Sequence, residues 1–123
     1  MLIYLVDDDQ EDQEIFDMAL LETGIQASLK CFNNATSFIE KFKGDCTVPD
    51  YVFLDLNMPK INGLECLKIL SNESCLNRSR IIVYSTSSNE KDINESKALG
   101  AHDYLIKPVS FQVLVNSIKS LLV

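Results

Sequence analysis

The segment YVFLD, residues 51–55, decides the fold class, because four consecutive apolar or aromatic residues run directly into an acid. A strand that is buried on both faces has no polar alternation, and continuous apolar character of this kind is typical of a parallel sheet. A second such segment, Ile81-Ile82-Val83, lies further along the chain. Because parallel strands need crossover connections, we expect helices between them.

The same pattern repeats along the whole chain. Five apolar runs rich in β-branched residues are predicted strands, at residues 2–6, 28–32, 51–54, 81–84 and 104–106. The stretches between them have helical spacing, and so does the last stretch, which carries an apolar residue every three or four positions from Phe111 to Leu122. Strict alternation of strand and helix predicts an α/β fold, with a parallel sheet covered by helices on both faces.

Local signals mark where the helices should begin and end. Asn34 is a predicted N-cap of the second helix, and Ser87 followed by Glu90 resembles a capping box. Gly24 and Gly100 stand where the first and fourth helices should end, since glycine readily adopts the left-handed conformation of a helix C-terminus.

Length and composition limit the classes of function. A chain of 123 residues has the size of one domain, so we expect residues 1–123 to form a single unit. Eighteen acids against eleven bases give a net charge of -7, which disfavours direct binding of nucleic acid. There is neither an apolar run near the roughly 20 residues of a membrane span nor a signal peptide, so we expect a cytoplasmic protein without membrane contact.

The cysteines give no sign of a metal site or a disulfide framework. None of the four falls in a CxxC pair, and the single histidine, His102, is distant from all of them in sequence. We expect reduced thiols, mostly buried, at Cys31, Cys46, Cys66 and Cys75. We expect His102 to be a surface residue.

Chemistry-bearing residues follow four of the predicted strands. They are Asp7, Asp8 and Asp9 after the first, Asp55 after the third, Ser85 after the fourth and Lys107 after the fifth. Ligands of open parallel sheets bind beyond the carboxyl ends of the strands, so we expect these side chains to converge. Clustered carboxylates repel one another, and a cation that prefers oxygen ligands, Mg²⁺ or Mn²⁺, is the simplest way to offset the repulsion.

A metal and Lys107 together would form a positive pocket suited to phosphoryl oxygens. Asp55, at the end of the central apolar strand, is the carboxylate best placed as a nucleophile, and an aspartyl phosphate is an established type of covalent intermediate. Asp9 and Asp12, taken alone, are also explained as residues that stabilise the N-terminus of the first helix.

Four segments resemble the signature segments of the receiver domain of two-component response regulators, in order and at the usual spacing. They are YLVDDD (4–9), VFLDLNMPKINGLE (52–65), IIVYSTS (81–87) and GAHDYLIKP (100–108). The resemblance covers essentially the whole chain and implies a flavodoxin-like, three-layer (βα)5 fold with strand order 2-1-3-4-5. It also implies a single-domain type of receiver, similar to those that serve phytochrome-type or hybrid histidine kinases.

The resemblance implies a role for each matched residue. Asp55 would be the phosphoacceptor, with Asp8 binding Mg²⁺ directly, Asp7 binding it through water and Asn57 adding its backbone carbonyl. Lys107 would pair with a phosphoryl oxygen.

Further positions match the family's switch and the loops around the site. Ser85 and Tyr104 match the switch hydroxyl and the switch aromatic, with serine in place of the commoner threonine. The bond to Pro108 is typically cis in the family. Pro59 and Gly63 would shape the loop after the phosphoacceptor.

The implied function is that of a stand-alone response regulator. It would take a phosphoryl group from a sensor histidine kinase or a histidine phosphotransfer protein, and its altered surface would contact a downstream protein target. A dimer through the fourth helix, fifth strand and fifth helix is also implied. Such a protein is not an enzyme acting on an external substrate, since it catalyses only its own Mg²⁺-dependent phosphorylation and dephosphorylation.

Three other functions remain open at this point. One is a pseudo-receiver that binds proteins independently of phosphorylation. Another is a phosphatase of the haloacid-dehalogenase type, although its motif needs a second aspartate where this chain has Asn57. The third is a flavodoxin, although the three acids Asp7 to Asp9 would repel the FMN phosphate.

Overall fold

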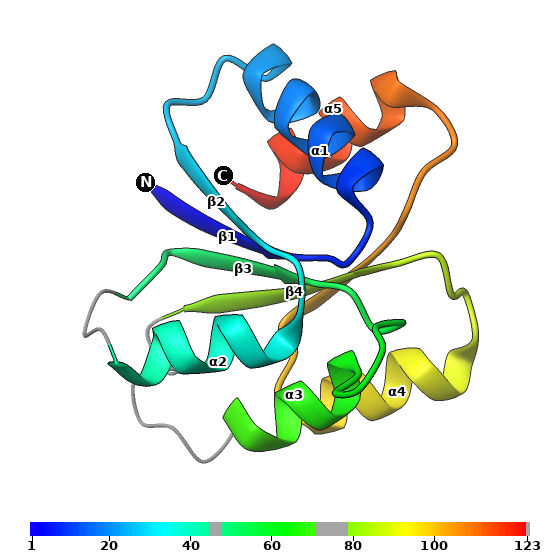
Figure 1. Ribbon diagram of the computed structural model, residues 1–123. Helices are drawn as coiled ribbons and strands as arrows, with labels where there is room; N and C mark the ends of the chain where they lie inside the picture. The colour runs from blue at the N-terminus through cyan, green and yellow to red at the C-terminus, as the bar shows by residue number, and fades with distance from the viewer. Residues whose placement is uncertain (45–47, 71–78, 123) are drawn as a thin grey trace.

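The computed structural model describes residues 1–44, 48–70 and 79–122, and within them five strands alternate with five helices (Figure 1). The strands are β1 (Leu2–Val6), β2 (Ser28–Phe32), β3 (Tyr51–Leu54), β4 (Arg80–Ser85) and β5 (Asp103–Ile106). The helices are α1 (Gln10–Glu22), α2 (Ala35–Gly44), α3 (Gly63–Leu70), α4 (Glu90–Ala98) and α5 (Phe111–Leu121). Each predicted strand agrees with an observed one to within a residue at either end.

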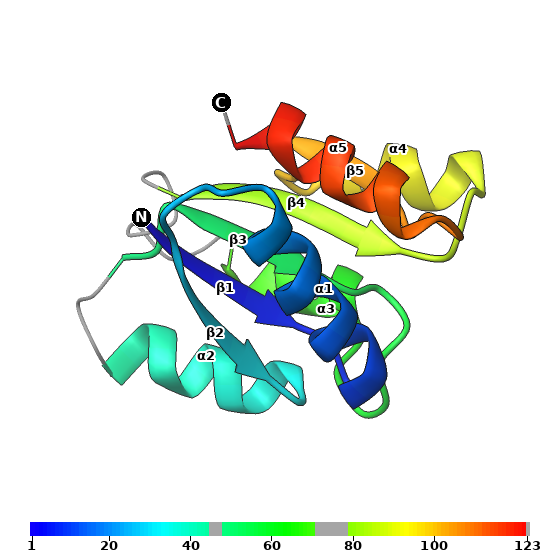
Figure 2. The same cartoon turned by 90° about the horizontal axis from the view of Figure 1, so that it is seen from above.

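The strands form one parallel sheet in the order β2-β1-β3-β4-β5. Helices α1 and α5 lie side by side on one face, and α2, α3 and α4 cover the other, as the two views in Figures 1 and 2 show. The chain therefore has the flavodoxin-like, three-layer (βα)5 architecture and the strand order that its resemblance implied. In this order β1 and β3 are neighbours at the centre of the sheet, so their carboxyl ends lie side by side.

The sheet divides the hydrophobic core into two layers, because successive residues of a strand point to opposite faces. Val52 packs with Phe38 of α2 and Leu67 of α3 in one layer. Its neighbour Phe53 packs with Phe16 of α1 in the other, where the two rings meet edge to face with their centroids 4.8 Å apart. The apolar character of β3 on both sides is thus explained by burial on both faces.

The predicted helix ends are mostly confirmed. The Asn34 side chain accepts the backbone N–H of Ser37 at 2.8 Å, as expected of an N-cap. Gly24 and Gly100 follow the ends of α1 and α4 with φ of 75° and 111°, in the left-handed region that favours glycine.

The capping box predicted at Ser87 and Glu90 is wrong. Helix α4 begins two residues later than that pattern requires, and Asn89 is its N-cap, with a side-chain oxygen that accepts the Lys91 N–H. The Ser87 hydroxyl instead donates to Asp92 Oδ2 at 2.7 Å. Since Asn89 is an equally good capping residue and lies closer to the apolar part of α4, it takes the position.

The cysteine prediction is confirmed at one described position and wrong at the other. Cys66 of α3 is fully buried, whereas Cys31 is exposed, and both thiols are free. Cys31 lies on β2, which forms an edge of the sheet and leaves several of its residues in solvent. Cys46 and Cys75 lie outside the described residues.

His102 is exposed, as expected, yet it also continues the ladder between β4 and β5. Its backbone N–H donates to the Ile81 carbonyl at 2.8 Å, and its ring Nδ1 accepts the Ile81 N–H at 3.0 Å. The side chain therefore satisfies a strand N–H at the point where the two strands begin to pair.

Candidate functional site

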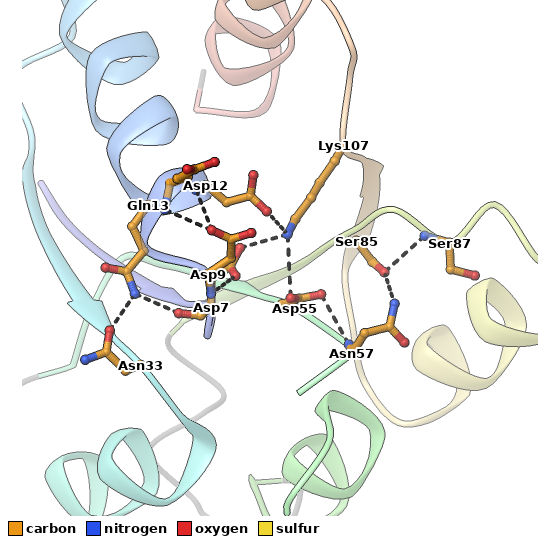
Figure 3. Close-up of polar contacts among 11 residues, drawn as sticks. Asp7, Asp9, Asp12, Gln13, Asn33, Asp55, Asn57, Ser85, Ser87 and Lys107 are labelled. Carbon is orange, nitrogen blue, oxygen red and sulfur yellow. Dashed lines mark hydrogen bonds and ion pairs between the residues drawn. The ribbon is translucent and has the colours of Figure 1, made fainter. Parts of the chain in front are cut away.

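The predicted site residues converge at the carboxyl ends of the strands (Figure 3). Asp7 follows β1, Asp55 follows β3, Lys107 follows β5, and Ser85 is the last residue of β4. The strand register explains this, since Val6 pairs with Leu54 and Ser85 with Ile106 (these are the last pairs of their ladders). Asp7, Asp55 and Ser85 are buried, with at most 5% of each residue exposed.

Three carboxylates form a compact acidic cluster. Asp7, Asp8 and Asp55 each offer one oxygen, and these three oxygens all lie within 4.8 Å of one another. Lys107 Nζ lies 2.8 Å from Asp7 Oδ2, 2.8 Å from Asp12 Oδ2 and 3.5 Å from Asp55 Oδ2. One ammonium thus faces several carboxylates, so the site keeps a net negative charge.

Hydrogen bonds fix Asp7 and leave Asp8 free. Asp7 Oδ1 accepts the Asp9 N–H at 2.9 Å, and the Asp7 carbonyl accepts Gln13 Nε2 at 2.7 Å. The same Gln13 nitrogen donates to Asn33 Oδ1 at 2.9 Å, which ties the first helix to the end of β2. The exposed Asp8 carboxylate makes no hydrogen bond or ion pair with the described residues, so it can turn toward a cation.

Lys107 is held from several sides. Besides its carboxylate partners, its Nζ lies 5.2 Å from the centre of the Tyr84 ring, within the range of a cation–π contact. Figure 3 shows the extended side chain reaching from the end of β5 to the acidic cluster. An ammonium with three donors and this many partners is oriented before any ligand arrives.

The loop after Asp55 needs a glycine. A Cβ on Gly63 would lie 2.5 Å from the Asp55 carbonyl oxygen and 2.6 Å from Leu56 Cα, and both contacts are with backbone. The Gly63 N–H donates to the Leu56 carbonyl at 3.0 Å, and Lys60 in the same loop, next to Pro59, has a left-handed φ of 64°. The expected role of Gly63 in shaping this loop is confirmed by the close approach.

Asn57 links Ser85 to Asp55 (Figure 3). The Asp55 Oδ1 accepts the Asn57 backbone N–H at 3.2 Å, and the Asn57 side-chain nitrogen donates to Ser85 Oγ at 3.5 Å. Ser85 Oγ also accepts the Ser87 N–H at 3.2 Å. The half-buried Tyr104 donates its hydroxyl to the Ser87 carbonyl at 2.8 Å, so Ser85 and Tyr104 contact the same residue.

A family model, the response regulator receiver domain, matches residues 3–119 of the chain. The chain belongs to the response regulator receiver domain family. Proteins of this family are signalling proteins rather than enzymes in the usual sense; they bind divalent metal in an acidic pocket and interact with histidine kinases and downstream effectors.

Curated relatives of this receiver domain are response regulators. NarL, the nitrate/nitrite response regulator of Escherichia coli K12, is 32% identical over 111 residues, which are 85% of this chain and 50% of that protein. An uncharacterised response regulatory protein of Yersinia pestis is 35% identical over 122 residues, or 97% of this chain and 47% of that protein. The chain spans about half the length of these two relatives.

Solved receiver structures have the same fold. The phosphorylated cyanobacterial phytochrome response regulator RcpA superposes with a TM-score of 0.87 at 27% identity, covering 98% of this chain and 89% of that one. The Mn²⁺-bound form of response regulator Rcp1 gives a TM-score of 0.83 at 25% identity, covering 98% and 90%. A receiver domain from Rhodospirillum rubrum gives 0.87 at 25% identity, covering 98% and 90%.

Burial raises the pKa of two acids of the receiver site, Asp7 and Asp55. It raises the Asp55 pKa to about 6, and although Lys107 lowers this pKa, Asp7 and Asp8 raise it further. Burial likewise raises the Asp7 pKa above its usual range, despite the hydrogen bond from Lys107. For Lys107, burial favours the neutral form, but hydrogen bonds to Asp12 and Asp7 outweigh it and raise the pKa. The site therefore keeps its ammonium and favours an added cation.

The acidic cluster fits the metal that the family binds. Its donor set is entirely carboxylate oxygen, which suits Mg²⁺ or Mn²⁺ better than a metal that prefers nitrogen or sulfur. Asp7, Asp8 and Asp55 would hold the ion, and the repulsion among them explains why a cation would bind.

In the described part of the receiver, no helix is long and apolar enough to cross a bilayer.

Sequence reasoning gave too little weight to Asp12 and missed Gln13. Asp12 lies in the first turn of α1, as expected of an acid that favours a helix N-terminus, and its carboxylate also contacts Lys107, while Asp9 is the N-cap. The sequence does hold a signal for both residues: α1 begins directly after β1, so the side chains of its first turn lie near the carboxyl end of β1, close to Asp7. The capping alternative for Asp9 is confirmed by its bonds to the N–H groups of Glu11 and Asp12.

One implied feature of the receiver site is wrong. No described peptide bond is cis, and this includes the bond between Lys107 and Pro108. The trans isomer is the more stable one at an X–Pro bond unless packing favours the other.

Proposed function

We propose that this receiver accepts a phosphoryl group on Asp55, in the presence of Mg²⁺, from a histidine kinase or a histidine phosphotransfer protein. One observation carries the proposal: the Asp55 carboxylate lies between the Asp7 and Asp8 acids, the Lys107 ammonium and the Asn57 backbone N–H. A nucleophile, a cation site and a fixed positive charge thus meet within one small space.

The transfer forms a bond between an Asp55 oxygen and phosphorus and breaks the bond between phosphorus and the donor's histidine nitrogen. Asp55 must be ionised to attack, and the Asn57 N–H and Lys107 both stabilise the ionised carboxylate. Bound Mg²⁺ would supply further positive charge for the phosphoryl oxygens and for the carboxylates around them. Asp7, Asp8, Asp55 and the Asn57 carbonyl are its proposed ligands.

Lys107 is suited to donate a hydrogen bond to a phosphoryl oxygen on Asp55. Its hydrogen bonds to Asp7 and Asp12 are both 2.8 Å long, while its contact with Asp55 is longer, at 3.5 Å. The ammonium can therefore turn one donor toward a group on Asp55 and keep its two anchors. Because the charge is already in place, little reorganisation is needed during transfer.

Ser85 and Tyr104 are the proposed switch residues. Within the described residues, Ser85 Oγ only accepts hydrogen bonds, from Asn57 and Ser87, so its own hydrogen is available to a phosphoryl oxygen. A move of Ser85 toward Asp55 would change its contact with Ser87, which Tyr104 also contacts. The phosphoryl group would thus shift the population between two arrangements of the β4–α4 loop.

The surface formed by α4, β5 and α5 is the proposed output of this shift. Ile106 at the end of β5 and Phe111 at the start of α5 are both exposed, at 43% and 42%. Ile106 pairs with Ser85 in the sheet, so an exposed apolar residue stands next to the proposed switch, and exposed apolar side chains suit a downstream protein target or a second copy of the chain.

A phosphorylation assay tests the proposal. The protein is incubated with Mg²⁺ and acetyl phosphate and its intact mass is measured, alongside Asp55→Asn and the control Asp17→Asn, which alters an exposed acid of α1. We expect a phosphoadduct on the wild type and on the control, and none on Asp55→Asn. Equal modification of Asp55→Asn would refute the assignment of Asp55.

The same assay separates the other functions. A wild type that takes up no phosphoryl group while binding Mg²⁺ would favour a pseudo-receiver. Steady release of phosphate from a phosphate monoester would favour a phosphatase, since a receiver is modified once and does not turn over an external substrate.

A further inference from the structure

Ser87 lies in the loop between β4 and α4, where its hydrogen bonds connect β4, β5 and the start of α4. Its backbone N–H donates to Ser85 Oγ at 3.2 Å (Figure 3), and its carbonyl accepts the Tyr104 hydroxyl at 2.8 Å. Its side-chain hydroxyl donates to Asp92 Oδ2 at 2.7 Å and accepts the Asn89 N–H at 3.3 Å. Every polar group of this half-buried residue is therefore in use.

We propose that Ser87 is a positioning residue for the switch. Its hydroxyl bonds to Asp92 and so fixes the β4–α4 loop to α4. The Ser87 carbonyl, which accepts the Tyr104 hydroxyl, is thereby held in place. This inference rests on the proposed function in one respect, the role of Ser85 and Tyr104 as a switch. The hydrogen bonds of Ser87 themselves exist without a phosphoryl group.

Asp92 is a firm anchor for the loop. It lies in the first turn of α4, where the helix dipole favours a negative charge. Its carbonyl accepts the buried Ser96 hydroxyl at 2.7 Å, so the first turns of the helix are themselves held together. A hydroxyl that donates to a carboxylate makes a charge-assisted hydrogen bond, which is stronger than one between neutral groups.

The side chain of Ser87 matters because its backbone is shared between two partners. If Ser85 turns toward a group on Asp55, the Ser87 N–H loses its acceptor. The bond from Ser87 Oγ to Asp92 would then be the contact that keeps the Ser87 carbonyl in place for Tyr104. Without that hydroxyl, the loop could follow Ser85 and release the aromatic ring.

A simpler explanation is that Ser87 only supports the start of α4. The Asn89 N–H does donate to Ser87 Oγ, so removal of the hydroxyl affects the loop in either case. The two explanations differ in their effect on Tyr104, because support of α4 alone requires no change at that ring. The state of the Tyr104 ring is therefore the decisive measurement.

The experiment records ring ¹H–¹³C NMR spectra of tyrosine-labelled, unphosphorylated protein in a chelating buffer. Four tyrosines contribute signals, and Tyr104→Phe assigns the relevant one. The variants are Ser87→Ala and Asp92→Ala, which each remove one partner, together with their combination. Ser87→Thr keeps the hydroxyl, and Ser88→Ala is the matched control, since the exposed Ser88 makes no side-chain hydrogen bond with the described residues.

We expect both single variants to change the ratio of held to released Tyr104 by about tenfold, which is a typical effect for the loss of one hydrogen bond to a charged group. The double variant should add little further change, and Ser87→Thr and Ser88→Ala should retain the wild-type signal. The signals of Tyr4, Tyr51 and Tyr84 should not move.

An unchanged Tyr104 signal in Ser87→Ala would overturn the proposal, and so would an equal shift of all four tyrosine signals. If Ser87→Ala does not fold, Asp92→Ala decides in the same way. The measurement needs no phosphorylation, so a wild type that fails to form a phosphoadduct would refute the proposed function and leave this inference standing. Conversely, normal phosphorylation with an unchanged Tyr104 would refute this inference alone.

Discussion

Replacement of Asp55 with asparagine should stabilise the metal-free protein at pH 8, even though it removes the proposed phosphoacceptor. Burial, with Asp7 and Asp8 nearby, raises the Asp55 pKa from an ordinary 3.8 to about 6. The folded protein therefore holds this proton more tightly than the unfolded chain does. The resulting contribution to stability is fully present below pH 4 and is lost as the pH rises through about 6.

The size of the effect follows from the shift. Each pKa unit corresponds to about 1.36 kcal/mol, so a rise of roughly two units costs the ionised wild type about 3 kcal/mol above pH 7. Asparagine is neutral at every pH and keeps an oxygen that can accept the Asn57 N–H. For a domain of this size, we expect Asp55→Asn to unfold about 10 °C above the wild type at pH 8.

Thermal and urea unfolding in a chelating buffer, followed by circular dichroism at several pH values from 4 to 8, measures this difference. The exposed-acid variant Asp17→Asn is the control and should follow the wild type throughout. We expect the advantage of Asp55→Asn to grow with pH and to vanish near pH 4. If Asp55→Asn were no more stable than the wild type at pH 8, or its advantage did not shrink on acidification, the electrostatic reasoning would be wrong.

Three further predictions concern the same site. Saturating Mg²⁺ should stabilise the wild type by about 2.7 kcal/mol at a hundredfold excess over its dissociation constant, and Asp8→Ala should lose most of this gain, as thermal unfolding with and without Mg²⁺ would reveal. Lys107→Ala leaves buried carboxylates without their ammonium, so we expect the free energy of unfolding in metal-free urea to fall by about 3–5 kcal/mol, and by less in Lys107→Arg. Equal losses in the two variants would contradict a role for the charge. In Gly63→Ala, the added Cβ pushes against the Asp55 carbonyl, so we expect the free energy of unfolding in urea to fall by about 1–3 kcal/mol and the Mg²⁺ affinity in titration calorimetry to weaken. An unchanged Mg²⁺ affinity would show that the loop adjusts elsewhere.

Much of the fold could be predicted because local and global signals agree. The apolar run before Asp55 is continuous because β3 is covered on both faces, and burial on both faces is what a central parallel strand requires. Residues at the ends of such strands must share one edge of the sheet, so Asp7, Asp55 and Lys107 could be brought together without coordinates.

The errors share a different origin. Ser87 fits a local capping pattern, but its hydroxyl bonds to Asp92, a partner that depends on how the loop turns before α4 begins. Asp12 does lie in the first turn of α1, as expected, but its further contact with Lys107 joins residues 95 positions apart, which no local pattern contains. Cys31 is exposed because β2 is the outermost strand. Composition and periodicity do not reveal this position, but the strand order that the resemblance implied does, and the prediction for the cysteines did not use that order.

The partition of the hydrophobic core by the sheet has a consequence for how sequences of this kind can diverge. Phe16 and Phe38 belong to separate clusters on opposite faces, with the backbone of the strands between them. Side chains that share no partner contribute independently to the free energy of unfolding, so the losses from truncating both rings should sum. One face can therefore accumulate substitutions over generations while the other stays unchanged.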